Sequence, residues 1–433
     1  MKITHIHIER FRGFQNEDFE VGSLLTAIAG QNGTQKSTLL GIITQTFTLK
    51  TEDSMRVEKP LCGGSYISAF KDKFRLSPTF DKPKGHEWTI SFDAGMDDFT
   101  VESIKRTGDP NVRFWKKGAR QEGDGYISFP TIFLSLKRLV PVAEEAKIIT
   151  DDTLLTQEEL NEFKQLHNKI LIAQTPISSA TTITSKNKQS IGVSTELYDW
   201  NQNSMGQDNL GKIILALFSF KRLHDKYPRQ YKGGILAIDE MDATMYPASQ
   251  VELLKVLRKY ASKLNLQILF TTHSMSLLKA MDDLVQEVTK KEETANQAKI
   301  LYLKKVDDKI AIKQGVNFKG IQLDLNVVAE GNNRKKNRIT AYTEDKENIL
   351  FVKAILKSKA FVLDFVDVTL PCSTLMELVT KRVPAFIYPY SIVILDGDVR
   401  MNKNDLRKIN NADNILILPG NKSPERLLAS YLY

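Results

Sequence analysis

The stretch around Gly30 constrains this chain more than any other part of its sequence. The apolar segment Val21–Ala29 predicts a strand, which leads through a polar loop into a helix. Gly30, Lys36 and Ser37 stand at the spacing at which loop N–H groups meet a phosphate, a lysine reaches it and a hydroxyl holds Mg²⁺. Gln35 occupies the position at which the usual pattern has a second glycine. The stretch therefore predicts an α/β domain with a phosphate site and one departure from the pattern.

The remaining composition sets wide limits. The 433 residues suffice for two or three domains. A net charge of +8 permits contact with nucleic acid and is equally consistent with a solvated surface. Cys62 and Cys372 lie far apart in the sequence, residues 1–20 lack the apolar core of a signal peptide, and no run of about 18 apolar residues occurs. We therefore expect a cytoplasmic protein without a membrane partner.

A second group of motifs lies in the middle of the chain. The apolar run Gly233–Ile238 ends in Asp239 and Glu240. A buried strand with this ending can deliver one carboxylate to a nucleotide-bound Mg²⁺ and a second one to a water molecule. Upstream, Ser204–Asp208 precede an apolar helix, and downstream a further apolar strand ends at His273. The order of these motifs, more than any one of them, indicates a nucleotide site.

The ordered set resembles the ATPase head of the ABC superfamily, in its SMC, Rad50 and RecF-like branch. The opening segment Ile8–Phe14 is similar to the first strand and turn of that branch, and the resemblance covers roughly residues 1–325. It implies an α/β fold in which an ABC-type ATPase head combines a mixed sheet, an antiparallel β lobe and a helical lobe. It also implies ATP and Mg²⁺ as cofactors.

The resemblance gives a role to the polar loop, as a Walker A motif. Lys36 is expected to bind the β- and γ-phosphates of ATP, and Ser37 to ligate Mg²⁺. Gln35 is expected to stand close to the β-phosphate, where it would slow hydrolysis. The expected ATP-binding residues of this motif are Gly30, Gln31, Asn32, Gly33, Thr34, Gln35, Lys36, Ser37 and Thr38.

The acidic pair and the histidine complete the expected chemistry. Asp239 is expected to support the metal, Glu240 to polarise the attacking water, and His273 to contact the γ-phosphate. Positioning and charge stabilisation would then supply most of the catalysis, as in phosphoryl transfer generally. The glutamine of the family's Q-loop is not assigned, and Gln45 and Gln121 are its two candidates.

The remaining motifs act between two heads in this family. Ser204, Gly206 and Gln207 correspond to the signature motif, and Asp242 to the D-loop. In the family, the signature motif of one head contacts the nucleotide of another. The resemblance therefore implies a homodimer, or a higher homo-oligomer, formed through the ATPase heads.

These motifs predict a division of the chain into two domains. Residues 1–328 form the expected ATPase domain, and residues 339–433 form a C-terminal domain. Residues 329–338 form a basic linker between them. Within the ATPase domain, short alternating runs predict an antiparallel β lobe at 51–130, and a helical lobe with the signature motif is expected at 145–225.

One segment of the predicted β lobe interleaves basic and aromatic residues. Arg113, Lys116 and Lys117 surround Phe114 and Trp115. Such a pattern can bind a phosphate backbone and stack bases, and an amphipathic edge strand explains it equally well.

The C-terminal domain alternates strands and helices, which predicts a small parallel sheet. Glu344 follows the predicted strand Ile339–Thr343, and Asp396 and Asp398 follow the predicted strand Ser391–Leu395. The carboxyl ends of parallel strands converge at one edge of a sheet. These three carboxylates could therefore hold a divalent metal, Mg²⁺ or Mn²⁺, for phosphodiester chemistry.

This arrangement resembles a TOPRIM domain. An ABC head followed by a TOPRIM domain resembles the OLD nuclease family, whose members act in bacterial antiphage defence. The resemblance implies an ATPase whose ATP-dependent dimerisation controls its own metal-dependent nuclease, with DNA or tRNA as the nucleic-acid partner. Glu344 is followed by Asp345 and not by the family's usual glycine, and Lys422 is a candidate for a catalytic lysine.

Two alternatives remain open at this point. With a degenerate TOPRIM-like domain, the chain would resemble the ATPase subunits of Septu-type, retron-associated or PARIS-type defence systems, which sense or restrain a separate effector nuclease or toxin. A RecF-like DNA repair ATPase is the other alternative, and it does not account for the C-terminal sheet.

Overall fold

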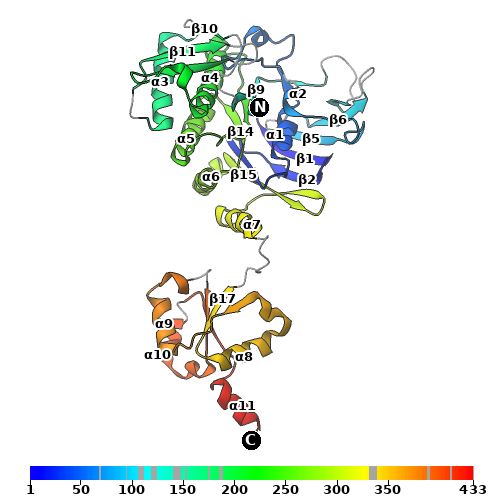
Figure 1. Cartoon of the computed structure of the whole chain (residues 1–433). Helices are drawn as coiled ribbons and strands as arrows, with labels where there is room; N and C mark the ends of the chain where they lie inside the picture. The colour runs from blue at the N-terminus through cyan, green and yellow to red at the C-terminus, as the bar shows by residue number, and fades with distance from the viewer. Residues whose placement is uncertain are drawn as a thin grey trace. The chain divides into compact units, whose positions relative to one another are not determined.

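The computed structural model divides the chain into two compact units, residues 1–322 and 323–433, each of which is described by itself (Figure 1). The boundary falls within the helix α7 (Phe318–Glu330), six residues before the end of the predicted ATPase domain. Most of the predicted basic linker lies outside the described residues. The structure describes residues 1–67, 70–93, 95–105, 112–118, 124–139, 148–151, 154–173, 176–184, 189–330, 339–387, 391–409 and 412–432.

A six-stranded mixed sheet forms the centre of the N-terminal unit, in the order β16-β15-β3-β14-β13-β9. All its neighbouring strands are parallel except β16, which pairs antiparallel with β15. Three of its strands are buried along their whole length, as their continuous apolar sequences require. The strands are β3 (Leu25–Gly30), β9 (Thr131–Leu134), β13 (Gly234–Ile238), β14 (Leu266–Thr272), β15 (Ala298–Val306) and β16 (Lys309–Lys313).

The helices α1 (Lys36–Thr44), α5 (Pro247–Lys263) and α6 (Met275–Val288) pack against this sheet. The helix that follows the Gly30 loop, α1, contacts β3 and β14. The helix α5 also packs against β14, and α6 packs against β15. The strands β4 (Phe47–Thr48), which follows α1, and β8 (Ile127–Ser128), which precedes β9, form a short parallel pair.

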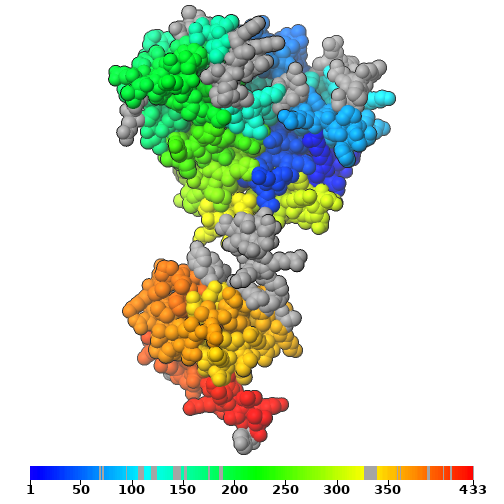
Figure 2. All heavy atoms as spheres, in the orientation of Figure 1, coloured from blue at the N-terminus to red at the C-terminus, as the bar shows by residue number. Residues whose placement is uncertain are grey.

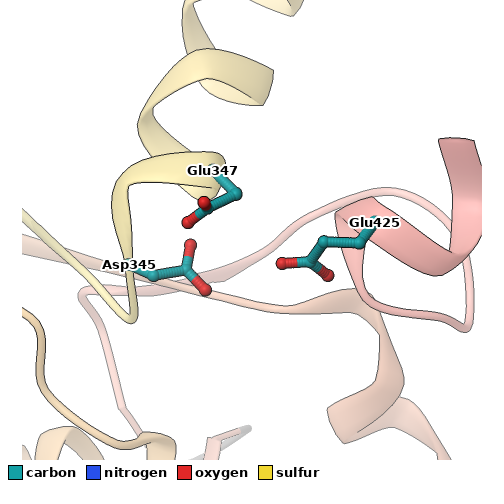
Figure 3. Close-up of side chains that lie close together, drawn as sticks. All are labelled: Asp345, Glu347 and Glu425. Carbon is teal, nitrogen blue, oxygen red and sulfur yellow. The ribbon is translucent and has the colours of Figure 1, made fainter.

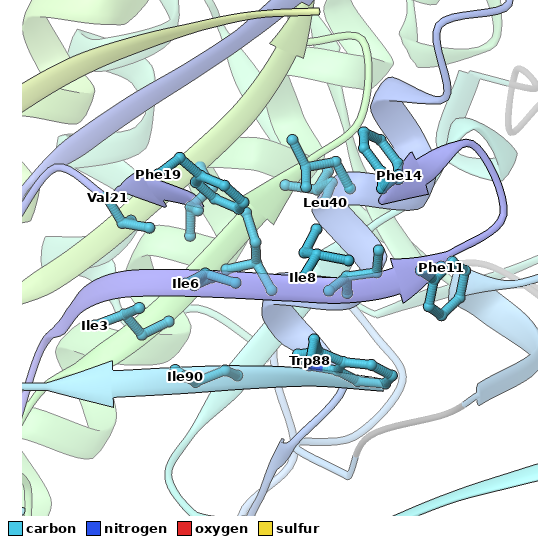
Figure 4. Packing of buried hydrophobic residues seen from close by; sticks show 14 of the residues in the cluster. Ile3, Ile6, Ile8, Phe11, Phe14, Phe19, Val21, Leu40, Trp88 and Ile90 are labelled. Carbon is cyan, nitrogen blue, oxygen red and sulfur yellow. The ribbon is translucent and has the colours of Figure 1, made fainter. Parts of the chain in front are cut away.

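The antiparallel β lobe has the strand order β2-β1-β5-β6-β7. Its inward side chains are fully buried, Ile6 and Ile8 from β1 among them, and they pack with Phe11 and Trp88 in one core (Figure 4). The prediction placed this lobe at 51–130 and therefore missed two of its strands, because periodicity shows that a strand exists and not which strand it pairs with. The elements are β1 (Ile3–Phe11), β2 (Phe14–Glu20), α2 (Phe70–Lys73), β5 (Glu87–Phe92), β6 (Phe99–Lys105) and β7 (Val112–Lys116).

The aromatic and basic segment of this lobe is an edge strand. Phe114 is 3% exposed and Trp115 is 7% exposed, so neither ring is available to stack on a base. The Arg113 guanidinium lies 4.0 Å from the centroid of the Trp115 ring, and Lys117 forms an ion pair with Glu87. The interpretation of this segment as a base-stacking surface is therefore wrong, and the amphipathic edge strand is the correct one.

The second lobe contains two long helices and a small sheet. Each helix begins with a capping box, formed by Thr156 and Glu159 in α3 and by Ser204 and Gln207 in α4. A three-stranded antiparallel sheet, which the sequence analysis did not predict, packs against α4. The elements are α3 (Gln157–Leu171), α4 (Met205–Lys226), β10 (Ile149–Asp151), β11 (Ser179–Thr184) and β12 (Gln189–Ser194).

The C-terminal unit is a four-stranded parallel sheet in the order β18-β17-β19-β20, with apolar clusters on its faces. The expected α/β fold class, a head with a mixed sheet followed by a small parallel sheet, is confirmed. The elements are β17 (Ile339–Thr343), α8 (Lys346–Leu356), β18 (Leu363–Phe365), α9 (Cys372–Thr380), β19 (Ser391–Leu395), α10 (Lys403–Ile409), β20 (Ile415–Ile417) and α11 (Pro424–Leu432).

The last helix, α11, stands out from the rest of the C-terminal unit (Figure 2). Its apolar side chains Leu428, Tyr431 and Leu432 are more than half exposed. In the described parts of the chain, no helix is long and apolar enough to cross a membrane. Cys62 and Cys372 are both free thiols.

Candidate functional site

The polar motifs of the N-terminal unit meet at the carboxyl edge of its central sheet. The register aligns Ala29 of β3 with Thr272 of β14, and Ile238 of β13 with Leu134 of β9. The loops that follow these four strands therefore start side by side. In open parallel sheets this edge is the usual place of a ligand site.

The loop after β3 has glycines where its backbone requires them. Gly30 has a φ of 154°, and a Cβ at this position would lie only 2.5 Å from the carbonyl oxygen of Leu303. Gly33 has a φ of 80°. The hydroxyl of Thr34 donates to the carbonyl oxygen of Gln31 at 2.8 Å and so closes the loop, while Asn32 is exposed at its tip.

Gln35 adopts a left-handed backbone conformation, with φ 61° and ψ 34°, at the N-terminus of α1. The usual glycine adopts such a conformation without cost, whereas a residue with a Cβ is strained by roughly 1 kcal/mol. Its carboxamide lies beside Gly13, at which an added Cβ would be 3.0 Å from the Gln35 Nε2. Its Oε1 is buried and has no hydrogen-bond partner among the described residues.

The first turn of α1 is suited to an anion. No side chain caps it, and it contains no acidic residue. Lys36 is 8% exposed, and its ammonium donates to the carbonyl oxygens of Gly30 at 3.1 Å and Gln31 at 2.9 Å. Burial lowers the pKa of Lys36, and the carboxylates that follow β13 oppose this shift. Ser37 and Thr38 follow on the same turn.

Asp239 is the centre of the site and is 5% exposed. Its Oδ1 accepts hydrogen bonds from the Ser37 hydroxyl at 2.9 Å and from the Thr271 hydroxyl at 2.7 Å. The backbone N–H of Glu240 donates to the Thr271 oxygen at 2.6 Å. These hydroxyl and carboxylate oxygens are the hard ligands that Mg²⁺ takes beside nucleotide phosphates, so the residues present fit the expected metal. The sequence analysis missed Thr271.

The loop after β14 is tied to the loop after Glu240. The N–H of His273 donates to the Asp242 carboxylate at 3.3 Å. Gln250 of α5 donates to the Asp242 carbonyl oxygen at 3.2 Å and accepts from the Ser274 hydroxyl at 2.5 Å. Burial, followed by the nearby ammonium of Lys36, lowers the pKa of His273. The imidazole is therefore mostly neutral at pH 7, with one ring nitrogen able to donate a hydrogen bond and the other able to accept one.

The signature residues begin α4 beside the same loop. Ser204 is the N-cap of this helix, and its hydroxyl accepts from the N–H of Gln207. A Cβ at Gly206 would lie 2.5 Å from the carbonyl oxygen of Thr244, so only glycine permits this close approach. The Gln207 carboxamide donates to the Tyr198 hydroxyl at 2.8 Å.

Two further residues of the site were missed by the sequence analysis. Arg138, which follows β9, is 2% exposed, and its guanidinium donates to the carbonyl oxygen of Glu240 at 2.8 Å. It also donates to the carboxamide oxygen of Asn209 at 2.7 Å. A single arginine after an apolar strand has no spacing pattern, so no sequence signal could have found this contact.

Of the two candidates for the Q-loop glutamine, the described residues include Gln45 alone. Gln45 is buried at the C-cap of α1, and the nine residues of this helix separate it from the phosphate end by about 13 Å. The other candidate, Gln121, lies outside the described residues.

In the C-terminal unit the predicted acids meet in part. The N–H of Asp396 donates to the Glu344 carboxylate at 2.8 Å, while Asp398 is exposed. Burial raises the pKa of Glu344 to about 7 and that of Asp396 to about 6, and neighbouring carboxylates add to both shifts. The Asn348 carboxamide opposes the rise at Asp396 through a side-chain hydrogen bond. Paired carboxylates are hard oxygen ligands of the kind that a divalent cation accepts. The Lys422 side chain is exposed.

A different acidic cluster lies nearby in the same unit (Figure 3). Asp345, Glu347 and Glu425 hold carboxylate oxygens within 4.8 Å of one another. Asp345 is the N-cap of α8, and the other two lie in the first turns of α8 and α11. Helix N-termini stabilise acidic side chains, so this cluster has a structural explanation without a metal.

Comparison with known proteins gave one family match and several similar solved structures. Residues 135–278 match the family model described as AAA ATPase domain. Sequence comparison with the curated proteins gave no match. Among solved structures, the SMC head domain from Thermotoga maritima is 14% identical, with a TM-score of 0.40, and covers 73% of this chain and 100% of its own.

Two further solved structures are similar to the same extent. An SMC head bound to the C-terminal winged-helix domain of ScpA is 14% identical, with a TM-score of 0.42 and coverage of 74% of this chain and 100% of its own. An SMC head with an extended coiled coil, bound to the C-terminal domain of ScpA from Pyrococcus furiosus, is 12% identical, with a TM-score of 0.39 and coverage of 76% and 99%. The match of residues 135–278 to the AAA ATPase family model is the finding that indicates an ATPase domain in this chain.

Proposed function

We propose that this chain is an ABC-type ATPase of bacterial antiphage defence, in which ATP-dependent pairing of two heads controls a metal-dependent nuclease activity of the C-terminal unit. The observation that carries the ATPase part is the Asp239 carboxylate, which accepts hydrogen bonds from Ser37 and Thr271 and acts electrostatically on the Lys36 ammonium. The antiphage part rests on the resemblance to the OLD family.

In the N-terminal unit, separate residues are proposed to bind the phosphates, the metal and the attacking water. Lys36 and the uncapped first turn of α1 bind the phosphates of ATP, and Ser37 and Asp239 hold its Mg²⁺, which neutralises charge on the phosphates. Glu240 orients the attacking water. Neutral His273 contacts the γ-phosphate from the neighbouring loop.

A second copy of this chain is the proposed partner of the head. Three apolar side chains are exposed around the signature motif and the loop after Glu240: Leu197 at 79%, Met205 at 45% and Tyr246 at 84%. They adjoin residues that contact each other, since Tyr198 bonds to Gln207 and Gly206 abuts Thr244. Their exposure supports an interface at this place.

ATP turnover with Glu240→Gln tests the ATPase part. Loss of a catalytic base lowers kcat by at least about a hundredfold and leaves ATP binding intact. The exposed Glu287 on α6 provides the matched control, because Glu287→Gln removes a carboxylate outside the site. Turnover by the Glu240→Gln chain at the wild-type rate would overturn the assignment of the base.

The C-terminal unit is the proposed nuclease. Glu344 and Asp396 meet at the carboxyl edge of its parallel sheet, and these two carboxylates would hold a divalent metal there, Mg²⁺ or Mn²⁺. Asp398 completes the proposed set of acids, and DNA or tRNA is the proposed substrate.

Cleavage of plasmid and tRNA by the full chain, with ATP and Mn²⁺, tests this second part. We expect cutting that EDTA and Asp396→Ala abolish and that Asp364→Asn, on the exposed side of β18, preserves. Cutting that survives Asp396→Ala would contradict the nuclease assignment. Intact substrate with the wild-type chain would favour the alternative in which a degenerate domain restrains a separate toxin or nuclease.

A further inference from the structure

The buried guanidinium of Arg138 connects three segments that the motifs treat separately. Its Nη1 donates to the carbonyl oxygens of Leu134 at 3.2 Å and Ser135 at 3.1 Å, at the end of β9. Its Nη2 donates to the carbonyl oxygen of Glu240 at 2.8 Å, and its Nε donates to the carboxamide oxygen of Asn209 at 2.7 Å. One side chain thus holds the edge of the sheet, the backbone of the proposed base and the signature helix α4.

Asn209 extends this connection to the loop after Glu240. It is fully buried one turn into α4, and its Nδ2 donates to the carbonyl oxygen of Ala243 at 2.9 Å. Near the start of the same helix, Gly206 abuts the carbonyl oxygen of Thr244. The first turns of α4 therefore cannot shift as a body without moving the backbone between Glu240 and Thr244.

The charge of Arg138 is costly at this depth. Burial lowers its pKa to about 10, and the carboxylates Asp239, Glu240 and Asp242 oppose the shift, so the guanidinium stays charged at pH 7. The desolvation cost of burying an apolar side chain is usually smaller than that of burying a charged one. Arginine offers instead a rigid fork of donors, and here the fork reaches four carbonyl or carboxamide oxygens at once.

We propose that Arg138 and Asn209 are positioning residues which couple the signature motif of a head to the Glu240 of the same head. This inference rests on the proposed function, in which the start of α4 meets the nucleotide of a second copy. Engagement of Ser204 and Gly206 shifts α4, and the Arg138–Asn209 pair transmits the shift to the backbone of Glu240. Each head then hydrolyses its own ATP only when its signature motif is occupied, and turnover is cooperative in ATP.

ATP turnover as a function of ATP concentration tests the proposal, with Asn209→Ala, Arg138→Lys and the double variant of the full chain. Wild type should show a Hill coefficient clearly above 1. Each variant should lower it to about 1 and lower kcat between about tenfold and a hundredfold, because small displacements of a reacting group have effects of this size. The dissociation constant of ATP, measured without turnover, should change less than about twofold.

The double variant and a control separate this role from a loss of stability. If the two residues act as one unit, the double variant loses no more kcat than the worse single variant. Gln267→Ala is the control: Gln267 is 1% exposed and holds β14 to the backbone of Ile3 and Gly22 through three hydrogen bonds away from the site. It should lower the melting temperature and leave the Hill coefficient unchanged.

Failure of the proposed function and failure of the coupling give different experimental results. Wild type without ATP turnover would overturn the proposed function itself. Wild type that turns over ATP without cooperativity, or variants that keep the wild-type Hill coefficient, would overturn the coupling alone. Additive losses of kcat in the double variant would also contradict a single unit.

Discussion

Gln35 is the residue at which this nucleotide loop departs most from its pattern. Replacement by glycine removes a left-handed strain of roughly 1 kcal/mol and the contact of the carboxamide with Gly13. If the glutamine restrains the loop, Gln35→Gly raises ATP turnover a few-fold, since about 1 kcal/mol corresponds to a factor near five. Steady-state ATP hydrolysis measures this.

Gln35→Ala separates the two causes, because alanine keeps the Cβ and loses the carboxamide. A rise in both variants assigns the restraint to the side chain, and a rise in the glycine variant alone assigns it to the backbone. Equal or lower turnover in Gln35→Gly would show that the loop simply accommodates glutamine.

His167 makes the stability of the N-terminal unit depend on pH. It is 2% exposed beside Phe163 on α3, and the side chain of Asn168 opposes the effect of burial on its pKa. Burial lowers its pKa from 6.5 to about 4. The unfolded chain therefore binds more protons, and the free energy of unfolding falls as the pH drops from about 6.5 towards 4.

Urea unfolding at pH 7.5 and pH 5 measures this dependence. The His167 contribution to the loss between these values is on the order of 2 kcal/mol, and His167→Leu should remove it. The exposed His224 on α4 is the control, and His224→Gln should keep the wild-type difference between the two pH values. An equal loss in the His167→Leu and wild-type chains would contradict the assignment.

At the scale of elements, the approach of α4 to the loop after Glu240 depends on Gly206. A Cβ there would lie 2.5 Å from the Thr244 carbonyl oxygen. The backbone at Gly206 or at Thr244 would have to move to relieve this clash. Gly206→Ala should therefore leave ATP binding to a single head intact and lower turnover at least about tenfold, because it displaces the loop that follows the base. Titration of ATP binding and a turnover assay on the same preparation measure both.

Gly211, one and a half turns further along α4, provides the matched control. A Cβ at Gly211 would lie 2.9 Å from the Ile191 side chain, so Gly211→Ala strains the packing of α4 on β12 and not on the site. It should lower the melting temperature and keep kcat. A similar loss of kcat in both variants would mean that general destabilisation explains the effect of Gly206→Ala.

The elements also show how far the sequence could predict this fold. The buried strands β3, β13 and β14 follow from continuous apolar runs, and β17 and β19 were predicted with the bounds that the structure shows. The pairing of β1 with β5 and the sheet of β10 to β12 could not be predicted, because pairing joins segments remote in sequence.

The same limit applies to the site. Spacing along the chain singled out Lys36 and Ser37 as candidates, and the end of an apolar run singled out Asp239, to which the Ser37 hydroxyl donates. Thr271, Arg138 and Asn209 belong to no such interval, and their roles appear only when the ends of four strands are set side by side. The role of a buried polar residue follows from its hydrogen-bond partners, and the sequence does not show which residues these are.

At the scale of the whole molecule, the two units carry separate chemical groups. The first holds a hydroxyl, carboxylate and ammonium set around Asp239, and the second holds two carboxylates, Glu344 and Asp396, with raised pKa values. ATP-driven pairing of the heads is the proposed link between the chemistry of the two units.

The mass of the Glu240→Gln chain in solution, determined by sedimentation with and without ATP and Mg²⁺, tests whether ATP pairs the heads. A chain that binds ATP without hydrolysing it should be trapped as a dimer with two bound nucleotides, and should be a monomer without ATP. Adding Ser204→Arg should restore the monomer, because a bulky charge at the N-cap of α4 blocks the interface. A mass that is the same with and without ATP would contradict the account.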